Sequence, residues 1–253
     1  RRRKTQRRRR KTQRRRRKTR SKMYGGEIEE ITKIPLKHGH LVISKGDITD
    51  FGAGKEWSAG DIGIVNAANI GGIKGSGVDG AIVKAGSQNL KNDRLKIPFL
   101  KDPNMDLGEV ETDRIHWGDA VATGPNRVGD NITGYGLMHA ATIIHAVGPD
   151  YKYFIPRGLL TVELCDIMLG RAYQKAMNVA ESRNIKYLAF PLISSGKFRV
   201  DESYKEYQTL EAVAKIAYNT VVQNTYPALQ EVHFATGGPN IDIMNRILCC
   251  ASD

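Results

Sequence analysis

Hydrophobic positions along the chain fall into short apolar runs that alternate with longer stretches of helical spacing. The short runs contain β-branched residues, and most of them end at Gly, Asp or Asn, which is typical of buried strands followed by loops. They cover residues 40–49, 61–69, 118–124, 141–150, 186–196 and 231–236. Apolar residues three or four positions apart predict helices at 78–86, 161–184, 202–224 and 240–251. Gly86 is the predicted stop of the first helix.

This alternation of strands and helices predicts an α/β fold, with helices packed on a central and mostly parallel sheet. Residues 87–117 show neither periodicity, and we interpret them as an irregular insertion or lid. The helix at 161–184 has a predicted core face made of Leu164, Ile167, Met168, Ala172 and Met177. In folds of this class, ligands bind beyond the carboxyl ends of the strands.

Charge is distributed unevenly along the chain. Residues 1–22 contain 16 of the 39 Lys and Arg residues and no acidic residue, so residues 23–253 hold 23 basic against 27 acidic side chains. The basic segment repeats RRRRKTQ-like units without an apolar face, and we expect it to be disordered. Such a segment directs a protein to the nucleus, binds RNA or DNA nonspecifically, or is an expansion without a specific partner. We interpret residues 23–253 as a single domain.

Composition argues against several classes of protein. No run of 18 apolar residues is present, so a membrane span is not expected, and no apolar signal-peptide region follows Arg1. Cys165, Cys249 and Cys250 form no paired framework, which predicts reduced thiols in a cytoplasmic or nuclear protein. No metal site is expected, and His145, which lies in an apolar strand, is interpreted as a core histidine.

The stretch IVNAANIGGIKGSGVDGAI, residues 64–82, needs a specific explanation because it places five glycines between positions 71 and 80. Glycine costs about 0.5–1 kcal/mol relative to alanine in regular structure, so the cluster indicates a sharp bend or a close approach to a ligand. Exposed N–H groups and the helix dipole at residue 78 favour an anion there. ISSGKF, residues 193–198, is a second loop of this kind, and two such loops can hold a diphosphate from both sides.

Residues 75–80, GSGVDG, formally match the G-x-G-x-x-G fingerprint of dinucleotide-binding folds. Nine residues separate the match from the preceding strand, and the acidic residue expected about 20 positions later at a second strand end is missing. No G-K-[ST] follows either, which argues against a P-loop. The glycines therefore predict an anion site of another kind.

Five motifs taken together resemble the macrodomain, the ADP-ribose-binding module. They are GDIT (46–49), VNAAN (65–69), GSGVDGAI (75–82), IIHAVGPDY (143–151) and AFPLISSGKF (189–198). Their order and spacing fit that family over residues 40–200. The resemblance implies a three-layer α/β/α sandwich with a mixed, mostly parallel sheet. It also implies ADP-ribose or ADP-ribosylated proteins as ligands, and no cofactor.

The resemblance assigns a role to each motif residue. Asp47 accepts a hydrogen bond from the adenine amino group, and the Ile48 backbone contacts the edge of the ring. Asn69 holds a hydroxyl of the distal ribose, and Phe198 packs on that sugar. The remaining residues that contact the ribose and diphosphate are Ala68, Gly75, Ser76, Gly77, Val78, Ser194, Ser195, Gly196 and Lys197.

Asn69 and Asp79 are the predicted catalytic residues. In the MacroD-like branch, which removes ADP-ribose from acidic side chains, an Asn and an Asp stand ten positions apart, as they do here. A carboxylate near the distal ribose orients or deprotonates the water that attacks the ester. The implied reactions are hydrolysis of mono-ADP-ribosyl esters on protein Asp or Glu and deacetylation of O-acetyl-ADP-ribose. The alternative for Asp79 is a structural residue of the first helical turn.

Two departures from that branch support a second interpretation. The glycine run reads GIKGSG, and Ser76 adds bulk where the water is expected. The region 234–240 lacks an obvious aromatic residue to stack on adenine, which leaves Phe234 and Asn240 as candidates. The alternative is therefore a non-catalytic reader of ADP-ribose marks, with a basic tail that binds nucleic acid. Turnover separates the two functions, because both proteins bind ADP-ribose.

Overall fold

The computed structural model describes residues 28–73, 75–100, 113–199 and 208–251. The predictions for the basic segment 1–22 and for the start of the helix at 202 lie outside these residues. No helix in this part of the chain is long and apolar enough to span a membrane.

A seven-stranded sheet runs through the centre of the fold in the order β1-β2-β9-β8-β3-β7-β4. Its strands are β1 (Glu29–Pro35), β2 (His40–Lys45), β3 (Ile62–Ala67), β4 (Ala120–Thr123), β7 (Thr142–Ala146), β8 (Tyr187–Phe190) and β9 (Glu231–Thr236). The four inner pairs are parallel, and the edge pairs β1–β2 and β4–β7 are antiparallel. This confirms the predicted mixed, mostly parallel sheet. The sequence pattern missed β1, because its side chains are exposed or half-buried and show no apolar face.

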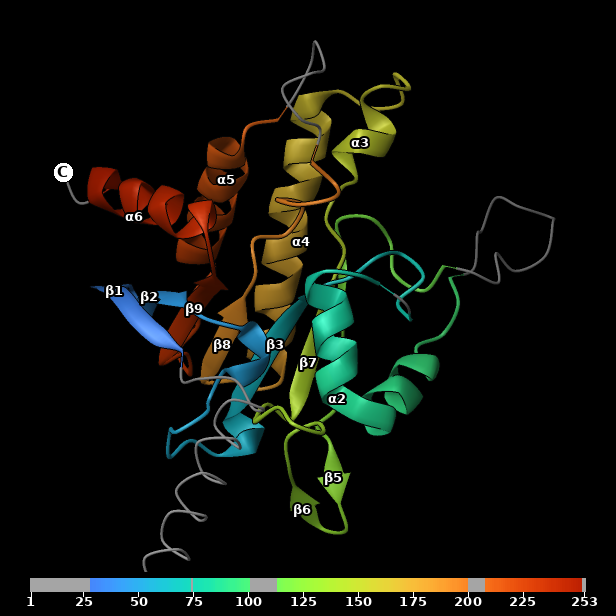
Figure 1. Cartoon of the computed structure of the whole chain (residues 1–253), viewed down its shortest axis with the longest axis vertical. Coiled ribbons are helices and arrows are strands. Elements are labelled where there is room, and N and C mark those ends of the chain that lie inside the picture. Colours follow the sequence, from blue (N-terminus) through green and yellow to red (C-terminus); the bar gives the residue numbers. More distant parts are fainter. Residues whose placement is uncertain (1–27, 74, 101–112, 200–207, 252–253) are drawn as a thin grey trace, which may run out of the picture.

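Helices cover both faces of the sheet, as parallel connections require (Figure 1). They are α2 (Val78–Leu95), α3 (Tyr151–Phe154), α4 (Val162–Ser182), α5 (Leu210–Gln223) and α6 (Pro239–Ala251). Residues of α4, α5 and α6 share one buried cluster with one face of the sheet, while α2 packs against the opposite face. The short elements are η1 (Ile48–Asp50), η2 (Ala59–Asp61) and the hairpin β5 (Arg127–Val128) with β6 (Asn131–Ile132), which was not predicted.

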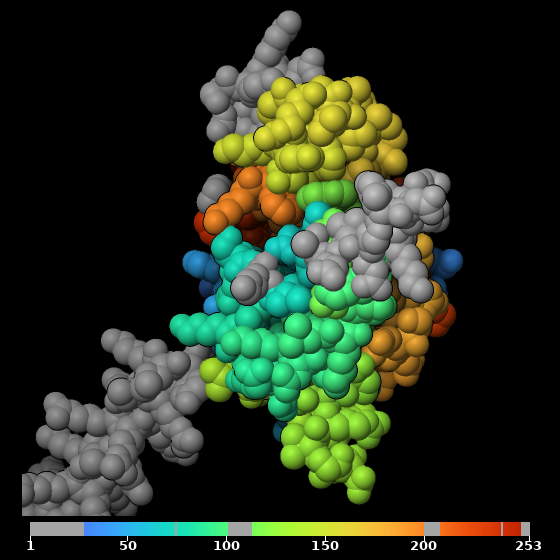
Figure 2. All heavy atoms as spheres, turned by 90° about the vertical axis from the view of Figure 1, so that its right-hand side faces the viewer, coloured from blue at the N-terminus to red at the C-terminus, as the bar shows by residue number. Residues whose placement is uncertain are grey.

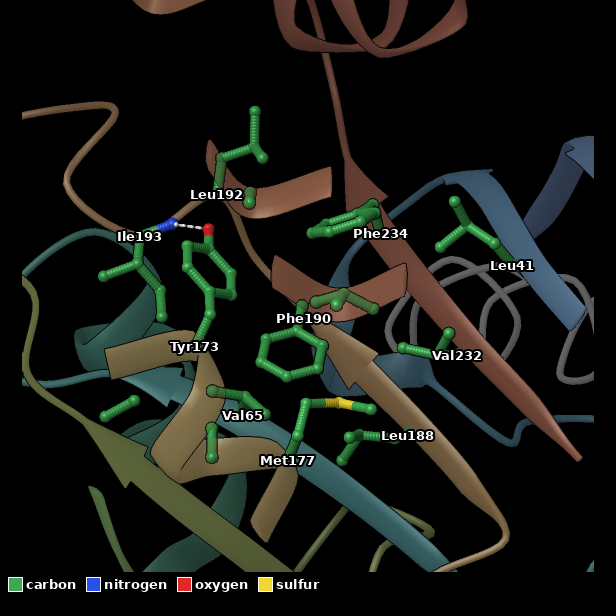
Figure 3. Packing of buried hydrophobic residues seen from close by; sticks show 14 of the residues in the cluster. Leu41, Val65, Tyr173, Met177, Leu188, Phe190, Leu192, Ile193, Val232 and Phe234 are labelled. Carbon is green, nitrogen blue, oxygen red and sulfur yellow. Dashed lines mark hydrogen bonds between the residues drawn. The ribbon is translucent and has the colours of Figure 1, made fainter. Parts of the chain in front are cut away.

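The larger core cluster contains Phe234, so this residue does not stack on adenine as proposed (Figure 3). Its ring is fully buried and lies 6.0 Å from the ring of Phe190 and 6.4 Å from that of Tyr173. The hydroxyl of Tyr173 accepts a hydrogen bond from the Ile193 N–H at 2.7 Å. The core is thereby fixed to the loop that follows β8.

The buried face of α4 differs from the predicted one. Leu164 and Ile167 are 49% and 68% exposed, so their assignment to the core is wrong, whereas Ala172 and Met177 are fully buried as predicted. The buried residues are Cys165, Leu169, Ala172, Tyr173, Ala176, Met177 and Ala180. Both faces of α4 carry apolar side chains at helical spacing. Packing on the sheet, and not the pattern alone, therefore selects the face that is buried.

The predicted insertion at 87–117 is wrong in its first part, because α2 continues to Leu95. The helix breaks at Ser87, which has φ 58° and ψ −158°, so Gly86 does mark the end of the first regular segment. The carbonyl of Ala85, next to the break, accepts a hydrogen bond from the Leu137 N–H at 2.9 Å. This backbone acceptor is therefore hydrogen-bonded although the helix is interrupted. Residues 101–112 of the predicted insertion lie outside the described residues.

Candidate functional site

A cavity of about 320 Å³ opens beyond the carboxyl ends of β3 and β8. It is lined by Ala67, Ala68, Asn69, Gly75, Ser76, Gly77, Val78, Asp79, Leu192, Ser194, Ser195, Gly196, Lys197 and Phe198. They come from two segments, one from the end of β3 to the first turn of α2 and one after β8. In Figure 2 the orange segment after β8 lies next to the teal segment around the start of α2. Volumes of about 300–1,000 Å³ are typical of small-molecule sites.

The loop before α2 is held close to its own helix, which explains two of its glycines. A Cβ atom on Gly75 would lie 1.8 Å from Asp79 Oδ2, so a larger residue does not fit without movement. Gly77 precedes the helix with φ 62°, a conformation that favours glycine. Because glycine supplies no capping side chain, the first N–H groups of α2 are left for a ligand in the cavity.

The serine hydroxyls of the loop after β8 are hydrogen-bonded within the protein. Ser194 Oγ donates to the carbonyl of Pro149 at 2.8 Å, and Ser195 Oγ donates to that of Leu192 at 2.7 Å. Ser194 has a φ of 59°, in the left-handed region that favours glycine. These contacts fix the loop, and the use of its backbone N–H groups as anion ligands stays a prediction.

Lys197 and Phe198 place a positive charge and an aromatic ring at the cavity. Lys197 Nζ donates to Ser76 Oγ at 2.8 Å and so joins the two loops. The ring of Phe198 lies 6.0 Å from that of Trp117, which in turn contacts Phe154 at 5.2 Å. The wall formed by Phe198 is therefore supported by aromatic packing behind it.

Asp79 is almost completely buried, with its side chain 3% exposed, and is held from two sides. Its Oδ1 accepts a hydrogen bond from Asn66 Nδ2 at 2.6 Å and lies 2.8 Å from Nη1 of Arg94. Its Oδ2 has no hydrogen-bond donor among the described residues. Asp79 is therefore a carboxylate held in one orientation, and one of its oxygens accepts no hydrogen bond from the described residues.

His145 lies behind Asp79 and extends the polar network into the sheet. Its Nδ1 lies 3.1 Å from Asn66 Nδ2 and its Nε2 lies 3.0 Å from Thr123 Oγ1. Complete burial, together with the nearby charge of Arg94, holds the pKa of His145 well below its ordinary value. His145 is thus a neutral histidine of the core with both ring nitrogens in polar contacts.

Most of the predicted site residues lie together, and two lie apart. All twelve predicted residues from the glycine loop and the ISSGKF loop line the cavity. Asp47 and Ile48 do not. Asp47 Oδ1 accepts from the N–H and Oγ1 of Thr49 at 3.0 and 2.8 Å, and the Ile48 side chain is buried. Both follow β2 at the edge of the sheet where β9 ends, since the Gly46 N–H donates to the Thr236 carbonyl at 3.3 Å.

Four residues of the site were not predicted. Ala67 and Leu192 line the cavity next to predicted positions, and Asn66 is the first asparagine of the VNAAN motif. The sequence therefore contained a signal for these three residues. Arg94 gave no such signal, because it lies beyond the predicted helix stop and 15 positions from Asp79.

Two further cavities lie elsewhere on the described part of the chain. One, of about 270 Å³, is bordered by Phe51, Trp57 and His233, and the other, of about 410 Å³, by Asp93 and Thr123. None of the predicted site residues lines either cavity. No group of three or more His, Cys, Asp or Glu side chains suited to a metal ion occurs among the described residues.

Comparisons with known proteins agree on one family. The family model described as Macro domain matches residues 65–206. O-acetyl-ADP-ribose deacetylase 1 of Pantoea vagans is 31% identical over 186 residues, which cover 73% of this chain and 87% of that protein. A macro domain-containing protein of Caldanaerobacter subterraneus is 38% identical over 135 residues, covering 53% of this chain and 61% of that protein. The Oceanobacillus iheyensis macrodomain with ADP has the same fold at TM-score 0.63 and 21% identity, covering 90% and 98% of the two chains.

Proposed function

Because the chain belongs to the macrodomain family, we propose that its cavity binds ADP-ribose and that the protein hydrolyses ADP-ribosyl esters. The observation that carries the proposal is the lining of the cavity. Two glycine- and serine-containing segments line it and are joined by the hydrogen bond from Lys197 to Ser76, and a fixed carboxylate lies beneath one of them. The relative named as an O-acetyl-ADP-ribose deacetylase supports the hydrolytic part of the proposal.

In this proposal, the diphosphate lies between the N-terminus of α2 and residues 194–197. The helix dipole, backbone N–H groups and the ammonium group of Lys197 all favour an anion at this position. The distal ribose lies between Asn69 and Phe198. The adenine extends towards Asp47 and Ile48 at the same edge of the sheet, outside the cavity itself.

Asp79 is the proposed catalytic residue of the hydrolysis, and Asn69 positions the distal ribose. Oδ1 of Asp79 is already held by Asn66 and Arg94, so Oδ2 is the oxygen that accepts a hydrogen bond from the attacking water. Because Oδ2 is buried beneath Gly75, this step requires the glycine loop to move aside. The water oxygen joins the acyl carbon, the acyl–oxygen bond breaks, and the ribose oxygen takes up a proton. Fixing the direction of one carboxylate oxygen is a typical way for a site to orient a nucleophile.

The proposal is tested with two substrates and one ligand. We expect release of ADP-ribose from a mono-ADP-ribosylated glutamate peptide, release of acetate from O-acetyl-ADP-ribose, and binding of ADP-ribose in calorimetry. Binding without release from either substrate would show that the protein is a reader of ADP-ribose marks and not a hydrolase. Absence of ADP-ribose binding would overturn the proposal.

The reader is the second candidate function, and one observation favours it. Ser76 places a side chain in the glycine loop, and its hydrogen bond to Lys197 crosses the cavity near the proposed diphosphate position.

A cytoplasmic or nuclear location, and nucleic-acid binding by residues 1–22, stay predictions from the sequence. Deletion of these 22 residues, followed by RNA binding at several salt concentrations, tests the second of them.

Replacing Lys197 with methionine is expected to weaken ADP-ribose binding about three- to tenfold and to make the affinity less dependent on salt. The reason is that a partly exposed ammonium–phosphate contact contributes about 0.5–1.5 kcal/mol and is screened by ions. Adenosine, which carries no phosphate, is expected to be unaffected. Calorimetry at two salt concentrations measures both effects.

The matched control is Lys84→Met, because Lys84 is exposed on α2 and does not line the cavity. If Lys84→Met and Lys197→Met have equal effects, the ammonium group of Lys197 does not contact the diphosphate.

A further inference from the structure

Arg94 is a fully buried arginine beneath the glycine loop. Its Nε donates to the carbonyl of Gly72 at 2.5 Å, and its Nη1 lies 2.8 Å from Asp79 Oδ1. One guanidinium group therefore contacts both the backbone of the loop and the carboxylate proposed for catalysis. Its side chain is 1% exposed, so it is not itself a ligand of a molecule in the cavity.

The contact between Arg94 and Asp79 depends on the break in α2. In a straight α-helix, residues 15 positions apart are separated by about 22 Å along the axis, at 1.5 Å per residue. The break at Ser87 turns the second half of α2 back towards the first, as the bent ribbon of α2 shows (Figure 1). Ser87 adopts a backbone conformation that is almost restricted to glycine, which costs energy that the surroundings must offset.

Stability alone is a weak explanation for this arrangement. Replacing a buried ion pair with apolar residues of similar volume is often neutral or stabilising. Moreover, Nη1 and Nη2 of Arg94 and Oδ2 of Asp79 have no hydrogen-bond partner among the described residues. Nη1 contacts Asp79 as an ion pair only, so the pair is not fully satisfied. A strained backbone that holds an incompletely satisfied charge next to a cavity is characteristic of functional sites.

We propose that Arg94 is a positioning residue of the cavity, an inference that rests on the proposed function. Through Gly72 it fixes the path of the glycine loop, and through Oδ1 it fixes the direction in which Oδ2 of Asp79 faces. The role requires arginine, because a planar guanidinium group holds a hydrogen bond at Nε and an ion pair at Nη1 in a fixed relative direction. A lysine ammonium group is a single point charge on a flexible stem.

The test uses the full chain with Arg94→Met, Arg94→Lys and the double variant Asp79→Asn/Arg94→Met. The double variant removes both charges, so it leaves no unpaired buried charge if Arg94→Met fails to fold. Arg127→Met is the matched control, since Arg127 is exposed on the β5–β6 hairpin. Amide hydrogen exchange of residues 66–80, ADP-ribose affinity, KM and kcat are measured for each variant.

We expect faster exchange in residues 66–80 and at least a tenfold loss of ADP-ribose affinity in Arg94→Met and in the double variant. Exchange in β8 and β9 is expected to stay unchanged. Arg94→Lys is expected to keep the Asp79 contact but not the Gly72 contact, so its loop exchange rises while its kcat is largely retained. Arg127→Met is expected to match the wild type in every readout.

Two results would overturn the inference. One is wild-type exchange in the loop of Arg94→Met, and the other is a uniform rise in exchange over the whole sheet, which marks a purely structural role. If the wild type does not bind ADP-ribose, the proposed function fails. The exchange data then still decide whether Arg94 positions the loop.

Discussion

Gly75→Ala is expected to weaken ADP-ribose binding by about fivefold or more. The added Cβ would lie 1.8 Å from Oδ2 and 2.6 Å from Cγ of Asp79, so the loop or the carboxylate has to move. Asp79 cannot easily turn away, because Asn66 and the buried Arg94 hold its other oxygen. Forcing extra atoms into a packed site costs about 1–3 kcal/mol, and 1.4 kcal/mol corresponds to a factor of ten in affinity. Calorimetry with ADP-ribose measures the loss.

Gly170→Ala is the matched control for that substitution. A Cβ atom on Gly170, in α4, makes only ordinary contacts, the nearest being 3.5 Å from Thr220 Oγ1, and Gly170 does not line the cavity. We expect wild-type affinity from Gly170→Ala. Wild-type affinity from Gly75→Ala as well would mean that the close approach of the loop to Asp79 is unimportant for binding.

Asp79→Ala is expected to lower the free energy of unfolding by about 3–5 kcal/mol, because it leaves Arg94 as an unpaired charge in the interior. Urea denaturation measures the change. The double variant Asp79→Asn/Arg94→Met is expected to recover most of this loss, since neither charge remains. Equal stability of Asp79→Ala and the wild type would show that the ion pair does not contribute to the free energy of unfolding.

The same double variant separates the structural role of Asp79 from its proposed catalytic role. If Asp79 orients the attacking water, kcat at saturating substrate is expected to fall at least 100-fold in the double variant, although the protein is folded. Turnover close to that of the wild type would leave Asp79 with a structural role alone. The sequence offered this as the alternative for a residue in the first turn of a helix.

Asp79 therefore illustrates how the same residue supports two interpretations. The sequence places it ten positions after Asn69 and predicts a carboxylate next to a bound ribose. The structure adds that the carboxylate is buried, paired with Arg94 and directly below Gly75. An assay of Asp79→Ala alone would combine a loss of chemistry with a loss of stability, which is why the paired variants are needed.

The family, the sheet and the two loops were predictable from the sequence because each depends on a local signal. Short β-branched runs specify buried strands, and the glycines of 71–80 and the serines of 194–195 mark loops at strand ends. Parallel strands bring these ends to one edge of the sheet, so twelve predicted residues meet in one cavity. The family resemblance, confirmed by the match to residues 65–206, supplied the ligand to test.

What only the tertiary structure decided are the contacts between residues without a shared local pattern. Phe234 became a core residue because both faces of its strand are covered, and α4 buried Leu169 and not Ile167 because of how it packs on the sheet. The pairing of Arg94 with Asp79 requires a helix that breaks at Ser87, where local propensity predicts no turn. Local sequence sets the conformation of each segment, whereas burial and charge pairing between segments depend on the whole folded chain.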